Sequence, residues 1–296
     1  MTQFLSLLLN GVSLGTMYAL IALGFVIIFK ASEVVSFTHG SLLLLGAYSI
    51  VRFADLWGFW AGTLAGVAVT GLVALVIERL VINPLRGAPV ISLAIVTIGV
   101  DIILLTDLTR RIGSDILNVP HPWGGQVFRI GSVGISLNRA LAILVAAVLI
   151  TAFFLAFKYS SWGVAMRASA EDGEAAALMG IRQGRVSMVA WVVAGALAAV
   201  AALFLVGAPT PGVSPAVYTV ALGALPAAIL GGLDSTGGAL VGGLLIGITE
   251  SLAAGYQSQL LFLGRGFSAV IPYIVMLVVL LVRPSGLFGT KELTRV

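Results

Sequence analysis

The sequence predicts an all-α polytopic membrane protein with about eight or nine transmembrane segments, some of them broken or re-entrant. Hydrophobic residues make up 59 % of the chain and charged residues 9 %, whereas a soluble domain has about 25 % charged residues. The mean hydropathy is +1.12, and a transmembrane helix needs about 20 mostly apolar residues. Residues 1–296 therefore read as a single transmembrane domain.

Nine apolar runs are candidate spans, and two or three of them are short enough to be half-helices or re-entrant segments. In chain order they are Phe4–Phe29, Gly40–Phe53, Phe59–Ile82, Val90–Leu108, Ala140–Phe157, Val186–Val206, Ala216–Leu230, Ala239–Ala254 and Phe267–Val282.

Glycine, proline and polar residues interrupt the apolar pattern at Ser36–Ser41, Pro209–Pro215 and Gly231–Gly238. Non-helical backbone at membrane depth is tolerated only where protein or a water-filled cavity covers it. The three breaks are therefore expected to mark a translocation path or its rims. Interfacial turns are the alternative, especially for the proline-rich break.

The basic residues orient the chain and carry no indication of nucleic-acid binding. If residues 159–185 are cytoplasmic, ten of the sixteen lysines and arginines lie inside and six outside, as the positive-inside rule favours. The N-terminus would then be outside and the C-terminus inside. The largest external segment, residues 109–138, contains VFRIGSVGISL, which predicts a small β-hairpin.

The loop 159–185 is the most hydrophilic stretch of the chain and contains the pattern of a short helix. Ser169 or Ala170 is expected at its N-cap, acidic residues follow in the first turn, and Gly180 ends it. Its apolar side is formed by Ala175, Ala176, Leu178, Met179 and Ile181. A short helix of this kind fits a groove on a partner; an ordinary charged loop is the alternative.

Catalytic and nucleotide-binding motifs are missing from the sequence. There is no cysteine, no HExxH and no GxxxxGK phosphate loop followed by Ser or Thr. His39 opens a broken span and His121 is expected in a surface turn. Acidic residues inside spans are functional candidates because they are costly there. Asp101 and Glu250 are two of them, and Glu250 either contacts a polar substrate or locks two helices together. Glu78 is expected to be neutralised by Arg79 or by neighbouring charges.

Five sequence blocks, in order, resemble the permease family of branched-chain amino acid ABC transporters. They are GVSLGTMYALIALGFVIIF with FTHGSLLLLGAY (11–48), IERLVINPLRGAPVISLAIVTIG (77–99), WGVAMRASAEDGEAAALMGI (162–181), AILGGLDSTGGALVGGLLIGITE (228–250) and LVRPSGLFG (281–289). Ser36, Thr38 and Asp101 depart from the family pattern. The resemblance implies an integral subunit of an ATP-driven importer in the bacterial inner membrane. Its partners would be a second homologous permease, two cytoplasmic ATP-binding subunits that hydrolyse the ATP, and a periplasmic substrate-binding protein.

These arguments predict no catalytic residue, metal or bound cofactor, and two groups of functional residues. The ATPase-coupling group is Arg167, Glu171, Asp172, Ala175, Ala176, Leu178, Met179 and Gly180. The substrate-path group is Phe37, Thr38, His39, Ser41, Asp101, Gly231, Gly232 and Glu250. The alternatives are an importer of the same class for other amino acids, amides, urea or aromatic acids, a secondary transporter, a passive channel and, weakest, an intramembrane enzyme.

Overall fold

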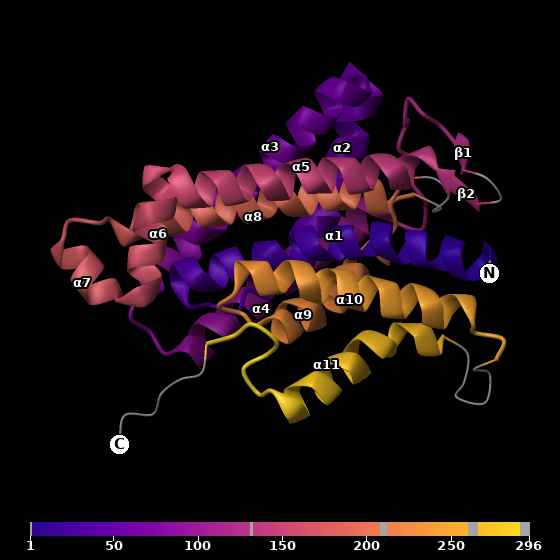
Figure 1. Cartoon of the computed structure of the whole chain (residues 1–296). Coiled ribbons are helices and arrows are strands. Elements are labelled where there is room, and N and C mark those ends of the chain that lie inside the picture. Colours follow the sequence, from indigo (N-terminus) through magenta and orange to yellow (C-terminus); the bar gives the residue numbers. More distant parts are fainter. Residues whose placement is uncertain (1, 131–132, 208–211, 260–265, 291–296) are drawn as a thin grey trace.

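The computed structural model of the chain describes residues 2–130, 133–207, 212–259 and 266–290. These residues are mostly helical, with one two-stranded sheet (Figure 1). In chain order the helices and strands are α1 (Thr2–Ser32), α2 (His39–Trp57), α3 (Phe59–Ile77), η1 (Glu78–Ile82), η2 (Asn83–Leu85), α4 (Val90–Ile112), β1 (Val127–Ile130), β2 (Val133–Ser136), α5 (Leu137–Tyr159), α6 (Ser161–Glu171), α7 (Gly173–Leu178), α8 (Gln183–Leu205), α9 (Val217–Gly231), α10 (Thr236–Gly255), η4 (Phe267–Ala269) and α11 (Ile271–Val282).

Six helices of the described residues are long and apolar enough to cross a membrane. They are α1, α3 with its two following turns, α4, α5, α8 and α10. Helix α9 and the segment Phe267–Val282 are apolar but shorter, and α2, at 19 residues, is longer than the predicted span Gly40–Phe53. The predicted helical class is confirmed, and the count of eight or nine spans stays a prediction.

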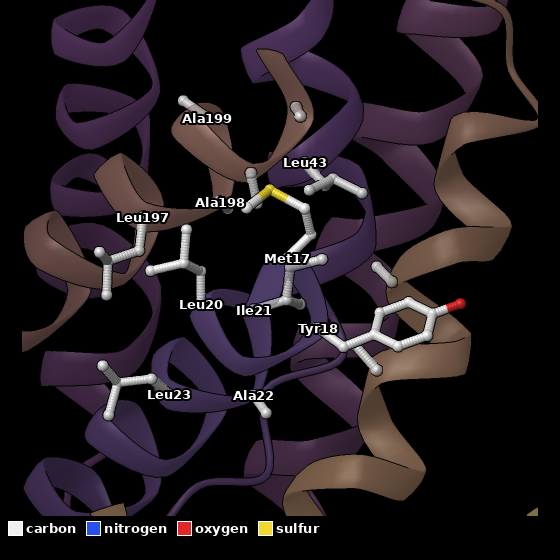
Figure 2. Packing of buried hydrophobic residues seen from close by; sticks show 14 of the residues in the cluster. Met17, Tyr18, Leu20, Ile21, Ala22, Leu23, Leu43, Leu197, Ala198 and Ala199 are labelled. Atoms are coloured by element: carbon white, nitrogen blue, oxygen red, sulfur yellow. The ribbon is translucent and has the colours of Figure 1, made fainter. Parts of the chain in front are cut away.

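Helix α1 lies at the centre of the bundle, where it packs against α5, α8, α9 and α10 (Figure 1). Met17, Leu20 and Ile21 are buried almost completely. Figure 2 shows Leu20 facing Leu197 of α8 and Met17 beside Ala198. A helix that is apolar on all sides belongs in the interior, and α1 therefore forms the core that the other helices surround.

Helices α1 and α10 approach so closely that their backbones touch at glycines. A Cβ added at Gly247 of α10 would lie 2.2 Å from the backbone N of Gly15, and one added at Gly243 would lie 2.4 Å from the N of Ala19. On α1, Gly11 and Gly15 are spaced four residues apart, as are Gly243 and Gly247 on α10. In lipid, small residues at this spacing allow the close approach that makes helices associate.

We predict that Gly247→Ala destabilises the bundle although alanine is the better helix former. The added methyl group would force α1 and α10 apart, and overpacking of this kind costs about 1–3 kcal/mol. Gly237→Ala in the same helix is the control, because a Cβ there meets nothing within 4 Å. Thermal unfolding in detergent should give a lower Tm for Gly247→Ala only; equal Tm values for the two variants would contradict the prediction.

The predicted β-hairpin is present within residues 109–138. Strands β1 and β2 are antiparallel, with Val127 opposite Ser136, and Ser136 then caps α5 by accepting a hydrogen bond from the Arg139 N–H. The same region contains His121 in a turn, where its ring packs against those of Phe59 and Trp123. Burial lowers the pKa of His121 to about 4, so the imidazole is neutral at pH 7.

The hairpin and the N-terminal end of α1 lie at one end of the bundle, and α6 and α7 lie at the other (Figure 1). The segments 109–138 and 159–185 are therefore separated by the length of the spans, as the orientation argument requires. Which end faces the cytoplasm stays a prediction.

Candidate functional site

Backbone N–H groups at the break between α1 and α2 donate hydrogen bonds to side chains of α4. Thr97 Oγ1 accepts a hydrogen bond from the Phe37 N–H at 3.2 Å, and Asp101 Oδ1 accepts one from the Ser41 N–H at 3.2 Å. Thr97 and Asp101 are one helical turn apart, so they lie on the same side of α4. Asp101 is only 4 % exposed, and its carboxylate is placed at the N-terminus of α2, where the helix dipole favours negative charge.

Asp101 also joins a third helix to this break. Its Oδ2 accepts a hydrogen bond of 2.7 Å from the Tyr218 hydroxyl of α9, and Tyr218 packs directly over Gly40, where a Cβ would lie 2.6 Å from its ring. Thr38 is the residue before α2 and its side chain makes no cap. Instead it bonds the hydroxyl of Ser36 at 2.8 Å, and its carbonyl accepts from the Ser41 hydroxyl.

His39 is fully buried beside this cluster. Its ring lies 4.6 Å from that of Phe25, and against Gly24, where a Cβ would lie 2.6 Å from the imidazole. Neither ring nitrogen has a hydrogen-bond partner among the described residues. Phe37, Thr38, His39, Ser41 and Asp101 are thus gathered at one place; their role in a substrate path stays a prediction.

Gly231 and Gly232 lie away from that break, in tight backbone packing at the turn between α9 and α10. A Cβ on Gly231 would lie 2.2 Å from the carbonyl O of Gly238, and Gly232 has φ +101° with Gly289 against it. The segment after α11 covers the turn, because the N–H groups of Leu287 and Phe288 donate to the carbonyls of Leu230 and Gly231 at 2.8 and 3.1 Å. This packing alone explains why both positions are glycine.

The third predicted break, Pro209–Pro215, is described only from residue 212, since residues 209–211 lie outside the described ranges. Val213 pairs through its backbone with Leu117, with hydrogen bonds of 2.8 and 3.0 Å. The part of this break that the structure describes is therefore tied to the loop that follows α4.

Glu250 is held against α1. Its Oε2 accepts a 2.7 Å hydrogen bond from the Tyr18 hydroxyl, and in Figure 2 the Tyr18 ring points away from Leu20 and Leu197. One residue further on, Ser251 donates to the Leu7 carbonyl at 2.8 Å. The carboxylate thus joins the two helices that are packed through glycine. It also lines a cavity near the hairpin end of the bundle.

The hydrophilic loop forms two helices rather than one. Helix α6 continues through Glu171, and Asp172 begins α7 by accepting a hydrogen bond from the Ala175 N–H at 2.9 Å. The prediction of a cap at Ser169 or Ala170 was therefore wrong. Asp172 adopts an extended backbone, the usual N-cap conformation, and its carboxylate is a strong capping group.

Gly180 ends α7 as predicted. It has φ +86°, and the N–H of Ile181 donates to the Ala176 carbonyl at 3.0 Å while that of Gly180 donates to Ala177 at 2.9 Å, which is the Schellman arrangement. Ala176 faces the rest of the chain and is only 5 % exposed, whereas Leu178 and Met179 are 89 % and 84 % exposed. Ala175, Glu171 and Asp172 are exposed as well. The end of a short helix and its C-cap residue thus display two large apolar side chains.

Arg167, in the first helix of this loop, contacts the C-terminal end of α5. Its guanidinium donates to the carbonyl oxygens of Phe157 and Lys158 at the end of α5 and lies 5.3 Å from the centre of the Phe157 ring. A cation at a helix C-terminus is favourable. Arg167 therefore fixes α6 on α5.

A chain of polar contacts connects α7 to the membrane-spanning helices. The Gln183 side-chain amide at the start of α8 donates to the Gly173 carbonyl of α7, and the Gln183 carbonyl accepts from Arg86 at 3.1 Å. Arg86 also forms an ion pair of 3.3 Å with Glu78, whose side chain is 0 % exposed. Glu78 begins a π-helical turn, a distortion that is frequent at functional sites. Glu78 is neutralised by Arg86 eight residues later.

Comparison with known proteins shows to which family this chain belongs. The sequence model of the family described as the branched-chain amino acid transport system / permease component matches residues 7–280. The chain belongs to this permease family. It is 31 % identical to the high-affinity branched-chain amino acid transport system permease protein LivH of Escherichia coli K12, over 99 % of the chain and 98 % of that protein. It is 30 % identical to BraD of Pseudomonas aeruginosa, over the same shares.

An archaeal relative is similar at the same level. The probable branched-chain amino acid transport permease protein LivH of Methanocaldococcus jannaschii is 31 % identical, over 93 % of the chain and 90 % of that protein. With six apolar helices and these relatives, the chain is a multi-pass membrane permease.

Several residues of these clusters were not singled out from the sequence. Thr97 accepts a hydrogen bond from the break at Ser36–Ser41, and Tyr218 donates one to Asp101 beside it. Tyr18 donates a hydrogen bond to Glu250. Gln183 and Arg86 connect α7 to the end of α3. Arg86 lies eight positions after Glu78, beyond the i+3 and i+4 reach of a regular helix, and the π-helical and 3-10 turns between them change that spacing. The others are ordinary polar residues in helices, and no local pattern distinguishes them.

We predict that Arg86→Met destabilises the permease strongly. It leaves the Glu78 carboxylate buried without a counter-ion, and removing one partner of a buried pair costs roughly 3 kcal/mol or more. Arg110→Met is the control, because the Arg110–Asp107 pair is exposed on both sides and exposed pairs contribute little. A loss of Tm in detergent for Arg86→Met well beyond that for Arg110→Met is expected; similar losses would show that Glu78 does not need Arg86.

Proposed function

We propose that this chain is a transmembrane permease subunit of an ATP-driven importer for branched-chain amino acids in the bacterial inner membrane. Its family membership and its relatives' names, both of the permease and of the branched-chain amino acid system, support the substrate class. The family is one of transporter components and not of enzymes. The complex would contain a second homologous permease, two cytoplasmic ATP-binding subunits that hydrolyse ATP, and a periplasmic substrate-binding protein.

The observation that carries the proposal is α7. Leu178 is the last residue of this six-residue helix and Met179 is its C-cap, and both side chains are almost fully exposed, at one end of the bundle and between two apolar spans. Large exposed apolar side chains of this kind mark interaction sites, and a short helix laid into a groove is a recurring mode of recognition. A channel or a secondary transporter needs no such docking helix.

The polar contacts behind α7 support its role in coupling. A displacement of α7 by a docked ATPase would reach Gln183 at the start of α8, then Arg86, and through it the buried Glu78 of the π-helical turn. These groups lie on three separate segments, so α7 cannot shift without changing their contacts. The proposed coupling residues remain Arg167, Glu171, Asp172, Ala175, Ala176, Leu178, Met179 and Gly180. Ala176 is the buried residue of α7, and Arg167 fixes α6 on the end of α5.

The substrate path is proposed to pass the break at Ser36–Ser41 and the cavity beside Glu250. Polar groups gather at both places: the side chains of Thr38, His39, Ser41 and Asp101 beside the Phe37 backbone at the first, and Glu250 at the second. Gly231 and Gly232 would contribute by holding α9 and α10 in place.

The test of the function is uptake by the reconstituted complex. Liposomes with the permease pair, the ATPases and the binding protein should take up leucine, isoleucine and valine when ATP is supplied, and liposomes with this chain alone should show no ATP-dependent uptake. The panel includes other amino acids, amides, urea and aromatic acids. Preferential uptake of one of these would replace the substrate class; ATP-driven uptake by the isolated chain would overturn the subunit assignment.

We predict that Leu178→Asp weakens association with the ATPase by about thirty-fold. Truncating an anchor residue of an interface costs about 2 kcal/mol or more, and every 1.4 kcal/mol is a factor of ten. Ile116→Asp is the control: Ile116 is an exposed apolar residue, 51 % exposed, in the loop after α4. Co-purification titrated against ATPase concentration measures the change. Equal retention of the ATPase by both variants would move the docking surface away from α7.

A further inference from the structure

A cavity of about 350 Å³ lies between α1, α5, α10 and the end of α8. It includes polar side chains, among them Asn10 of α1, Arg139 of α5 and Glu250 of α10, and apolar ones, among them Met17, Ala142 and Phe204. Its volume is at the low end of the range of ligand pockets, about 300–1,000 Å³. A small solute therefore fits it.

Two opposite charges line this cavity without pairing with each other or with another charge. The Arg139 guanidinium donates to the amide oxygen of Asn10 at 2.5 Å, and Glu250 accepts from the neutral Tyr18 hydroxyl. Among the residues that the structure describes, neither lies within 4 Å of an opposite charge. Charges in a membrane-spanning bundle are costly unless they are paired or functional, and here each keeps hydrogen-bonding capacity for a ligand.

The remaining wall of the cavity combines the polar side chains of Ser13, Asn138 and Ser251 with an apolar side. Met17 and Ala142 are each 2 % exposed and Phe204 is 7 % exposed, so the apolar side is formed by fixed core residues. A ligand that satisfies all three features carries a carboxylate, an ammonium group and a short aliphatic side chain.

We propose that this cavity is a binding station for an aliphatic α-amino acid within the permease itself. The ligand carboxylate pairs with the forked guanidinium of Arg139, which suits carboxylate geometry, with Asn10 orienting that fork. The ammonium group pairs with Glu250, and the side chain lies toward Met17, Ala142 and Phe204. This inference rests on the proposed function and adds to it a site, a ligand orientation and the residues responsible.

The chain has no cysteine, which allows a direct test. Ala254 lines the cavity and is exposed, so Ala254→Cys in the assembled complex, in nanodiscs without the binding protein, is labelled with a water-soluble maleimide. L-leucine is expected to protect it. Leucinol lacks the carboxylate and 4-methylpentanoate lacks the ammonium group, so each should protect at least tenfold less well, as expected for the loss of one charged contact.

Charge-removing variants then assign each contact. With Arg139→Gln, leucine and leucinol should protect equally; with Glu250→Gln, leucine and 4-methylpentanoate should protect equally. A purely structural role would not change this discrimination. Arg111→Gln, on an exposed ion pair, is the matched control variant and should retain it, and Ser114→Cys in the loop after α4 is the control label that leucine should leave unprotected.

The proposal is overturned if leucine does not protect, if all three compounds protect alike, or if the two variants lose protection by all three to the same extent. If Arg139→Gln does not assemble, the three compounds on Ala254→Cys alone decide the matter. ATP-driven leucine uptake by the same Ala254→Cys complex, with binding protein added, is measured in parallel. Uptake without protection rejects the site and leaves the function standing; protection without uptake rejects the function.

Discussion

The contact between α1 and α10 determines where the other helices can lie. Lipid offers no hydrophobic drive for helix association, so the bundle is held by close packing and by hydrogen bonds between helices. Gly15 and Gly247 bring the two backbones together, and this approach places Tyr18 within hydrogen-bond distance of Glu250 and Leu7 within that of Ser251. Because α1 is buried on all sides from Gly15 to Ile28, its remaining surfaces serve as the template for α5, α8 and α9.

Three intramembrane acids each join segments that are far apart in the sequence. Asp101 connects α4 with α2 and α9, Glu78 connects the end of α3 with Arg86 and thereby α8, and Glu250 connects α10 with α1. A buried carboxylate is unfavourable unless it is hydrogen-bonded. Each of these contacts therefore opposes separation of its helices, and each would have to be exchanged for other partners if the bundle changes shape during transport.

The sequence was sufficient to predict the elements that follow from composition and local chemistry. The lengths of the apolar runs predicted the helices, and the alternating pattern VFRIGSVGISL predicted the hairpin. The glycine at position 180 predicted the end of α7. The start of α7 was missed, because both Ser169 and Asp172 are good capping residues and only the continuation of α6 through Glu171 decides between them. The partners of Asp101 and Glu250 were not predictable, since Tyr218 and Tyr18 lie 117 and 232 residues away.

The hydrogen bonds that the segment after α11 donates to the α9–α10 turn have a consequence for the order of folding. Asp234 receives the Thr290 N–H from 56 residues later in the chain, and Leu230 and Gly231 receive theirs from Leu287 and Phe288. At a synthesis rate of about 5–20 residues per second, that delay is roughly 3–11 s. Helix α10 is synthesised in the first part of this interval, and until residues 287–290 follow, the acceptors at the α9–α10 junction lack these donors. The turn is closed only after α11 has left the ribosome, so a late segment completes a junction made earlier in synthesis.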